Sequence, residues 1–232
     1  MILIPVKNLR NAKQRLAPVL DQSSRTELAR AMLADVLQSV AEYPDAKVSL
    51  VTSDSYALEL AAAYRFEVIR DDKNLGESDA IHMATEFSMA AGASYTLVIP
   101  ADVPLLEADD LRAIDESAPA TGSVVVPSRD RRGTNAILRR PAALFPLRFG
   151  NDSFVPHLGA AIASLTSAVV LSLPRLALDI DTAEDLEELV RAPGEKRAQH
   201  LARRLGFSGA ANPGTFLSFG QAETRPAAAK NG

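Results

Sequence analysis

Four basic side chains follow the first apolar segment of the chain: Lys7, Arg10, Lys13 and Arg15. Lysine acts on a phosphate as a point charge, and arginine can hold it with two parallel hydrogen bonds. The segment could therefore hold a polyphosphate, and the alternative is a solvated basic loop. It carries neither G-x-x-x-x-G-K-[ST] nor G-x-G-x-x-G, so both common glycine-rich nucleotide motifs are absent from the sequence.

Three aspartates supply carboxylates that suit a hard metal ion. Asp102 closely follows the apolar run 95–99, where a carboxylate can hold Mg²⁺ between nucleotide phosphates. Asp179 and Asp181 alternate with apolar residues, so an extended backbone directs both side chains to one face. A turn or helix cap is the competing interpretation for Asp102. For the second pair it is a helix N-cap at Asp181 or Thr182.

Two polar segments contain groups that bind small anions. The segment 131–135 includes Thr134 and Asn135, and the segment 149–153 includes Gly150 and Ser153. Hydroxyls and backbone N–H groups of this kind suit a phosphate or a carboxylate. Two ordinary surface turns are the alternative.

Composition narrows the chemistry further. The 232 residues include no cysteine, which excludes disulfides, thiolate zinc sites and cysteine nucleophiles. The three histidines, His82, His157 and His200, show no metal-ligand spacing, and we interpret them as structural or surface residues. A metal in this protein would then be a hard cation held by carboxylates, and Mg²⁺ is the one expected.

Charge and hydropathy bear on partners and location. The net charge of −4 argues against general nucleic-acid binding, although a local basic pocket still suits a small phosphorylated ligand. Lys7 interrupts the first apolar segment, and no stretch approaches about 18 uninterrupted apolar residues. We therefore expect a cytoplasmic protein with no membrane partner.

Apolar patterning predicts alternating strands and helices. A capping box at 24–27 opens the first helix, whose apolar positions run from Leu28 to Val40. Further helices are predicted at 54–64, 80–91, 107–116, 160–165, 182–190 and 198–205. Strands are predicted at 2–4 (ending at Pro5), 48–51, 66–69, 95–99, 123–127, 135–139 and 169–173.

This alternation predicts an α/β fold: a three-layer sandwich with a mainly parallel mixed sheet covered by helices on both faces. Ligands of such sheets bind beyond the carboxyl ends of the strands. The segments 5–15, 52–54, 71–79 and 100–104 lie at such ends, so we expect them to converge. We predict a single domain over 1–207 and a poorly ordered tail over 208–232, where glycine, alanine, asparagine and proline dominate.

Taken together, the segments resemble the CofC/FbiD family of guanylyltransferases, which work in the biosynthesis of the deazaflavin coenzyme F-420. The similarity covers roughly residues 1–190, with the motifs in the family's order. It is carried by Ile4-Pro5-Val6-Lys7, Ala12-Lys13-Gln14-Arg15-Leu16, Arg30-Ala31-Met32-Leu33-Ala34-Asp35, Pro100-Ala101-Asp102-Val103-Pro104, Gly133-Thr134-Asn135, Phe149-Gly150 with Ser153, and Asp179-Ile180-Asp181-Thr182.

The resemblance implies a GT-A-type, Rossmann-like nucleotidyltransferase that transfers GMP from GTP to the phosphate of a three-carbon phosphoacid and releases pyrophosphate. It implies that Asp102 and Asp181 bind Mg²⁺ and that Lys7 and Lys13 lie near the nucleotide phosphates. Residues assigned to GTP binding are Pro5, Val6, Arg15, Thr52, Gly76 and Ser78. Residues assigned to the acceptor are Thr134, Asn135, Gly150 and Ser153.

The loop after Leu75 departs from the family, whose members usually have Gly-Leu-Asn there. This chain has Gly76, Glu77 and Ser78. A more polar pocket suits a hydroxylated acceptor, so the sequence slightly favours 3-phospho-D-glycerate over the family's other acceptors, phosphoenolpyruvate and 2-phospho-L-lactate.

Other interpretations stay open at this point. A sugar-phosphate or molybdopterin nucleotidyltransferase would usually carry a glycine-rich loop after the first strand, which this chain lacks. A non-catalytic nucleotide-binding protein could share the fold, and in a purely structural domain the polar strand ends would be coincidence. Beyond GTP and a phosphoacid, we expect hand-off of a labile product to a downstream transferase, with a homodimer as one candidate assembly.

Overall fold

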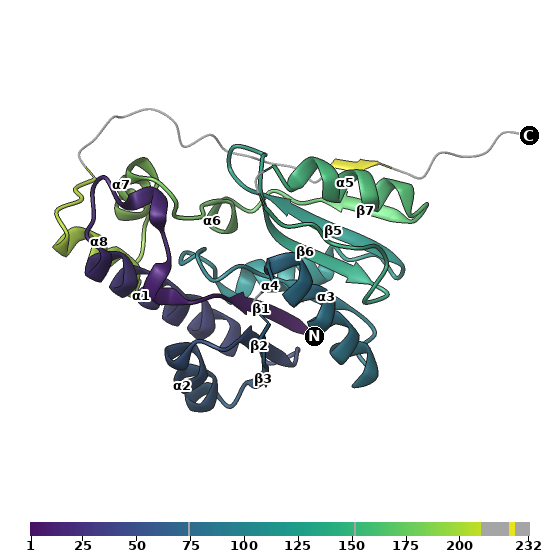
Figure 1. Ribbon diagram of the computed structural model, residues 1–232. Helices are drawn as coiled ribbons and strands as arrows, with labels where there is room; N and C mark the ends of the chain where they lie inside the picture. Colours follow the sequence, from purple (N-terminus) through teal and green to yellow (C-terminus); the bar gives the residue numbers. More distant parts are fainter. Residues whose placement is uncertain (74, 151, 210–222, 226–232) are drawn as a thin grey trace, which may run out of the picture.

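A computed structural model describes residues 1–73, 75–150, 152–209 and 223–225 of the chain (Figure 1). The strands of the described part are β1 (Ile2–Val6), β2 (Val48–Thr52), β3 (Glu67–Ile69), β4 (Thr96–Val98), β5 (Gly122–Pro127), β6 (Thr134–Arg140), β7 (Ser167–Val170) and β8 (Glu223–Arg225). They form one sheet in the order β3-β2-β1-β4-β6-β5-β7-β8.

Helices connect most of these strands. The 3₁₀ turns are η1 (Leu9–Asn11) and η2 (Gln14–Leu16). The α-helices described are α1 (Gln22–Ala41), α2 (Ser55–Tyr64), α3 (Glu77–Ala90), α4 (Ala108–Glu116), α5 (Phe154–Ala163), α6 (Pro174–Ala177), α7 (Ala183–Arg191) and α8 (Arg197–Arg204). None of the helices in the described ranges is long and apolar enough to cross a membrane.

The sheet is mixed, with a parallel part around its first strand. β1 pairs in parallel with β2 and β4, and β2 pairs in parallel with β3. β6 runs antiparallel between β4 and β5, β7 is parallel to β5, and β8 is antiparallel to β7. This arrangement confirms the predicted α/β fold with a mixed sheet.

Two hydrophobic cores lie on opposite faces of the sheet. Along β1, Ile2 and Ile4 belong to one core and Leu3 to the other, because successive strand residues point to opposite faces. Residues of α1, α2, α4, α7 and α8 complete the first core, and residues of α3 and α5 complete the second. Figure 1 shows α2 beside β2 and β3, and α5 along β7 near the other end of the sheet. The three layers follow from this two-faced burial.

Several predicted boundaries are wrong, and the structure explains three of them. β1 continues through Val6, because β4 pairs only with Ile2 and Leu3 and so β1 has a single neighbour where Pro5 lacks an N–H. The helix α1 begins before the predicted capping box, because Asp21 already accepts from Ser24 N at 2.7 Å.

The third error is at α5, which begins six residues before the predicted 160. Pro156 and Gly159 interrupt the apolar pattern there. Proline is nevertheless tolerated in a first turn, whose N–H groups have no partner within the helix. At the C-terminal end of the chain, most of the predicted tail lies outside the described residues. The strand β8, which pairs with β7, was not predicted from the sequence.

Candidate active site

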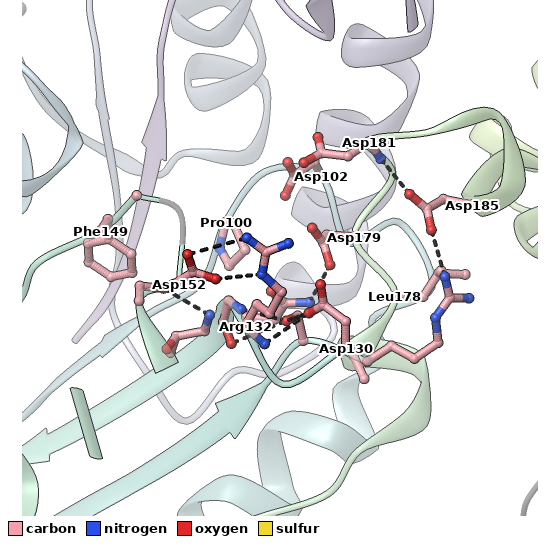
Figure 2. A pocket seen from close by; sticks show the side chains of 18 of the residues that line it. Pro100, Asp102, Asp130, Arg132, Phe149, Asp152, Leu178, Asp179, Asp181 and Asp185 are labelled. Carbon is pink, nitrogen blue, oxygen red and sulfur yellow. Dashed lines mark hydrogen bonds and ion pairs between the residues drawn. The ribbon is translucent and has the colours of Figure 1, made fainter. Parts of the chain in front are cut away.

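A pocket of about 470 Å³ opens at the edge of the sheet where β4 and β5 end and β6 begins. Asp102 reaches it from the turn after β4, Thr134 from the start of β6, and Asp181 from the segment before α7. Much of the rest of the wall comes from Glu77 at the start of α3, from Arg15 of η2, and from Phe149, Gly150, Asp152 and Ser153 before α5. Figure 2 shows Asp102, Asp179 and Asp181 gathered on one side of this pocket.

Lys13 joins the two carboxylates that the sequence proposed as metal ligands. Its Nζ lies 2.6 Å from Asp102 Oδ2 and 2.9 Å from Asp181 Oδ1, and its side chain is only 8% exposed. Arg15 Nη1 binds the other oxygen of Asp181 at 3.0 Å. We call Lys13, Asp102 and Asp181 the carboxylate cluster.

The local backbone explains how distant residues meet here. Lys13 adopts a left-handed conformation (φ 56°), which is uncommon for a residue with a side chain and is typical of functional sites. Ile180 N donates to Asp102 O at 3.2 Å and holds the two aspartate segments together. The N-cap of α7 is Thr182, whose hydroxyl accepts from Asp185 N, so the Asp181 carboxylate stays available for Lys13.

The charges of the cluster stabilise one another. Burial by itself would lower the pKa of Lys13, but Asp102 and Asp181 outweigh burial and raise that pKa above its ordinary value. Burial would likewise raise the pKa of Asp181, yet Lys13 and Arg15 hold that pKa below its usual range. At neutral pH the cluster is therefore one ammonium between two carboxylates.

Asp179 lines the same side of the pocket but is held by a neutral group. Asn135 Nδ2 donates to Asp179 Oδ1 and to Leu176 O, both at 3.0 Å. Burial raises the pKa of Asp179, and the Asn135 hydrogen bond only partly opposes this. Asn135, which the sequence assigned to the acceptor, thus positions Asp179 on the pocket wall.

Glu77 brings a further carboxyl group to the pocket. Burial and the charge of Asp102 raise the pKa of Glu77 to about 6, against the opposing effect of Lys7 and Lys13. Lys7 itself is exposed after β1. Because Lys7 acts on Glu77 through charge, the described structure places it near this wall of the pocket without making it part of the lining.

A second group of site residues is neutral. Thr134 N donates to Ser153 Oγ at 3.1 Å, and Thr134 Oγ1 lies 3.0 Å from His157 Nδ1. All three residues are almost fully buried, and Thr134 and Ser153 line the pocket. Gly150 lines it too, with a φ of 139° that favours glycine. We call Thr134, Ser153 and His157 the hydroxyl cluster.

Of the residues assigned to GTP binding, some lie at the pocket and others lie within the sheet. Arg15 lines the pocket, whereas Pro5 and Val6 lie within β1 and Thr52 is fully buried. The Thr52 hydroxyl donates to Val6 O at 2.7 Å and accepts from Asp54 N at 3.0 Å.

Gly76 and Ser78 lie at the start of α3 and are not among the described residues that line the pocket. Gly76 is the N-cap of the helix, with a φ of 150°. Ser78 Oγ accepts from Phe149 N at 2.9 Å, which connects α3 to the loop that carries Gly150. The described pocket therefore brings together the residues that the sequence assigned to the acceptor and to the metal, while Ser78 anchors one of its loops.

Several residues in or beside the pocket were given no role of their own by the sequence. Arg132 and Asp152, which both line the pocket, form a two-point ion pair (Figure 2), and Arg129 pairs with Asp185 at 2.8 Å. His157 was interpreted as structural. A signal existed in each case, namely the basic run 129–132 and a histidine four residues after Ser153, but the late predicted start of α5 left His157 outside any helix.

The carboxylate cluster fits a hard divalent cation in its donor chemistry. Asp102 and Asp181 direct oxygens to one common point, where Nζ of Lys13 lies. Mg²⁺ is usually bound by one or two carboxylates together with water and substrate phosphates. No group of three or more His, Asp or Glu side chains in the described ranges is placed to hold a metal by itself. The remaining ligands would then come from water and substrate.

Solved structures share this mixed α/β fold. A protein of Desulfovibrio desulfuricans described as a nucleotide-diphospho-sugar transferase superposes with a TM-score of 0.73 at 19% identity, over 88% of this chain and 93% of that one. A cytidylyltransferase of Leptospira borgpetersenii superposes with a TM-score of 0.51 at 14% identity, over 88% and 90%.

Comparison by sequence identifies the family of the chain. The family model described as guanylyl transferase CofC like matches residues 1–219, and the chain belongs to this family. The phosphoenolpyruvate guanylyltransferase of Roseiflexus castenholzii is 38% identical over 203 residues, covering 88% of this chain and 93% of that protein. The 2-phospho-L-lactate guanylyltransferase of Methanothermobacter thermautotrophicus is 32% identical over 206 residues, covering 89% and 91%. The resemblance drawn from the sequence motifs is confirmed.

Proposed function

We propose that this protein transfers GMP from GTP to the phosphate of a three-carbon phosphoacid, releasing pyrophosphate, as a step in coenzyme F-420 biosynthesis. One observation carries the proposal: a single pocket is lined both by the two aspartates of the carboxylate cluster and by Thr134 and Ser153 of the hydroxyl cluster. The first suits a nucleotide triphosphate with its cation, and the second suits the anionic end of an acceptor.

The reaction needs no general base. A phosphate oxygen of the acceptor, already ionised at neutral pH, attacks the α-phosphorus of GTP. The new P–O bond forms as the bond between the α- and β-phosphates breaks, and the electron pair leaves with pyrophosphate. Positioning and charge neutralisation supply most of the catalysis in such transfers. The absence of cysteine and of an ionised histidine in the pocket agrees with this chemistry.

Two anions must meet, so we propose a role for Mg²⁺ in neutralising the phosphates. Asp102 and Asp181 would hold it, and when bound it lowers the charge on the reacting phosphates. Lys13, Arg15 and Lys7 add positive charge along the nucleotide, where it would stabilise the departing pyrophosphate. Gly76 and the β1 residues Pro5 and Val6, with Thr52 behind them, would then shape the nucleotide side of the site.

The acceptor side is proposed to be the wall formed by Thr134, Asn135, Gly150 and Ser153. Glu77 bears on which acceptor is preferred. Only 3-phospho-D-glycerate, among the three acceptors considered, has a hydroxyl that could donate to this carboxyl group. We keep 3-phospho-D-glycerate as the predicted preference, and the names of the relatives make phosphoenolpyruvate and 2-phospho-L-lactate the alternatives to test.

The test is pyrophosphate release from GTP with Mg²⁺ and each of the three acceptors. Because the diphosphate product would be labile, the assay is coupled to the next transferase, to which we expect the product to pass. Release that depends on an acceptor supports the proposal. Nucleotide binding without any release would instead indicate a non-catalytic protein, and release only with a sugar phosphate or a pterin phosphate would indicate the other nucleotidyltransferase types.

The same assay resolves the acceptor. A Glu77→Gln variant keeps the shape of the side chain but removes its charge. If a hydroxyl of 3-phospho-D-glycerate donates to Glu77, the variant loses several-fold in kcat/KM with that acceptor and little with phosphoenolpyruvate. A wild-type preference for 2-phospho-L-lactate would contradict the prediction.

A further inference from the structure

His157 is buried beside the pocket, yet the reaction as described gives it no task. It lies in the first half of α5, and only 1% of it is exposed. Both ring nitrogens have partners: Nε2 accepts from Arg148 N at 2.9 Å, and Nδ1 lies 3.0 Å from Thr134 Oγ1. The ring thus connects the loop that leads to Gly150 with the first residue of β6.

The contact with Arg148 decides where the ring proton lies. A backbone N–H can only donate, so Nε2 must be the unprotonated nitrogen. The proton of the neutral ring is then on Nδ1, and Nδ1–H donates to Thr134 Oγ1. Burial, together with the charge of Arg139, lowers the pKa of His157 to about 4, which agrees with a neutral ring at neutral pH.

This tautomer directs the hydroxyl of Thr134. Because Oγ1 already accepts from Nδ1–H, its own hydrogen must point away from the ring, and Thr134 lines the pocket. Ser153 is in a similar position, since its Oγ accepts from Thr134 N. Each hydroxyl therefore accepts from within the protein and keeps its hydrogen for an outside acceptor, which is the arrangement an anion needs.

The other ring nitrogen acts on the loop. Arg148 N binds His157 Nε2 and the next amide, Phe149 N, binds Ser78 Oγ, so two consecutive amides before Gly150 are held by side chains. The Phe149 ring also packs edge-on against His157, with centroids 5.0 Å apart. His157 therefore supports both sides of the proposed acceptor wall.

We propose that His157 is a positioning residue whose Nδ1–H makes Thr134 a hydrogen-bond donor to the anionic acceptor, while its Nε2 holds the loop of Gly150. The inference rests on the proposed function, because it assigns the Thr134 wall to a phosphoacid. It adds the residue that sets the polarity of that wall.

Two substitutions separate the two tasks of the ring. The amide of His157→Asn lies where Nδ1 was and can still donate to Thr134, whereas that of His157→Gln lies where Nε2 was and can only hold the loop. We expect His157→Gln to raise the KM for the phosphoacid about 10- to 100-fold, the effect of losing one hydrogen bond to a charged ligand. Its KM for GTP should stay unchanged, and His157→Asn should recover most of the loss.

A measurement independent of activity checks the tautomer. Long-range ¹H–¹⁵N correlation spectra of the full chain should show one histidine protonated at Nδ1 from pH 6 to 8, and the signal should vanish in His157→Gln. The matched controls are His82→Gln and His200→Gln, because those side chains are 72% and 61% exposed. Calorimetric titration of phosphoenolpyruvate into protein with α,β-methylene GTP, which cannot transfer GMP, measures acceptor binding.

These readouts keep the two proposals apart. If the wild type binds phosphoenolpyruvate but transfers GMP to none of the three acceptors, the proposed function fails and the role of His157 in binding still stands. An Nε2-protonated or charged His157 would overturn the positioning role whatever the activity. So would acceptor KM values in His157→Gln equal to wild type, or an equal loss in KM for GTP and for the acceptor. Thermal unfolding of each variant confirms that it is folded.

Discussion

Members of the carboxylate cluster and of the hydroxyl cluster line the same pocket, but the first cluster is built from charges and the second from neutral hydrogen bonds. Lys13 lies between Asp102 and Asp181 at 2.6 and 2.9 Å, whereas Thr134 contacts Ser153 and His157 at 3.1 and 3.0 Å. Removing one member of a buried ion pair leaves an uncompensated charge. Removing one neutral hydrogen bond costs much less. The comparison teaches that the proposed nucleotide side of the pocket is built on charge balance and the proposed acceptor side on donor orientation.

The largest effect is expected from Asp102→Asn. The change removes a proposed Mg²⁺ ligand and one of the two anionic partners of Lys13, while the shape of the side chain is kept. We predict that kcat falls by about 100-fold or more, the scale of losing one electrostatic stabiliser in an active site. Steady-state pyrophosphate release at saturating GTP and Mg²⁺ measures it.

The matched control is Asp109→Asn, because the Asp109 side chain is 74% exposed on α4. It should leave kcat unchanged. A near-normal rate for Asp102→Asn at saturating Mg²⁺ would refute the role given to the carboxylate cluster.

Lys13→Met tests the charge balance from the opposite side. Without the ammonium, Asp102 and Asp181 lose their shared counter-charge, and the ion pair between Arg15 and Asp181 remains. We predict a loss of kcat approaching 100-fold, because the nucleotide loses a positive charge. We also predict tighter binding of Mn²⁺ to the nucleotide-free protein, because the cation no longer competes with Nζ.

Activity assays measure the loss of kcat, and Mn²⁺ electron paramagnetic resonance titration measures the affinity for the cation. Lys47→Met, at an exposed site before β2, is the control for losing a lysine. Unchanged or weaker Mn²⁺ binding in Lys13→Met would show that the carboxylate cluster is not the cation site.

A smaller and more selective effect is expected from Thr134→Val. The substitution keeps the side-chain shape and removes the donor aimed into the pocket. The KM for the phosphoacid should rise about tenfold or more while kcat and the KM for GTP change little. Thr166→Val, after the end of α5, is the control. A drop in kcat as large as that of Asp102→Asn would erase the distinction between the two clusters.

The smallest effect concerns the pH dependence of stability. The pKa of His157 is lowered to about 4 in the folded protein, mainly by burial, against about 6.5 for an unfolded histidine. Between these values the unfolded chain binds more protons, so His157 makes stability fall as the pH falls from 6.5 to 4. Glu77, with a pKa raised to about 6, acts in the opposite direction between pH 4.5 and 6.

Scanning calorimetry of the wild type and His157→Gln from pH 4 to 7 isolates the histidine. The difference in Tm between them should shrink by a few degrees toward acid pH, because the variant has no buried imidazole whose lowered pKa makes stability fall with the pH. His200→Gln, with an exposed side chain, should follow the wild type. A difference that does not vary with pH would mean that the pKa of His157 is the same in the folded and the unfolded protein, so that burial does not lower it.

Much of the fold was predictable from local signals. Runs such as 48–51 and 95–99 are apolar enough to need burial on both faces, and α4 and α7 have strongly amphipathic patterns with acidic first turns. The wrong boundaries at Pro5, Asp21 and Ser153 depend on neighbouring residues. They are set by where β4 stops pairing with β1, by which residue caps α1, and by the presence of a proline in the first turn of α5.

The sequence alone determined that the chain has no thiol chemistry, and it predicted carboxylates for a hard cation and lysines near the first strand for phosphates. The sequence also identified the family, because the motifs occur along the chain in the family's order. Only the tertiary structure decided that Lys13 lies between Asp102 and Asp181, and that His157 orients Thr134. These contacts join residues 89, 168 and 23 positions apart, and no local pattern encodes which distant partner a side chain meets.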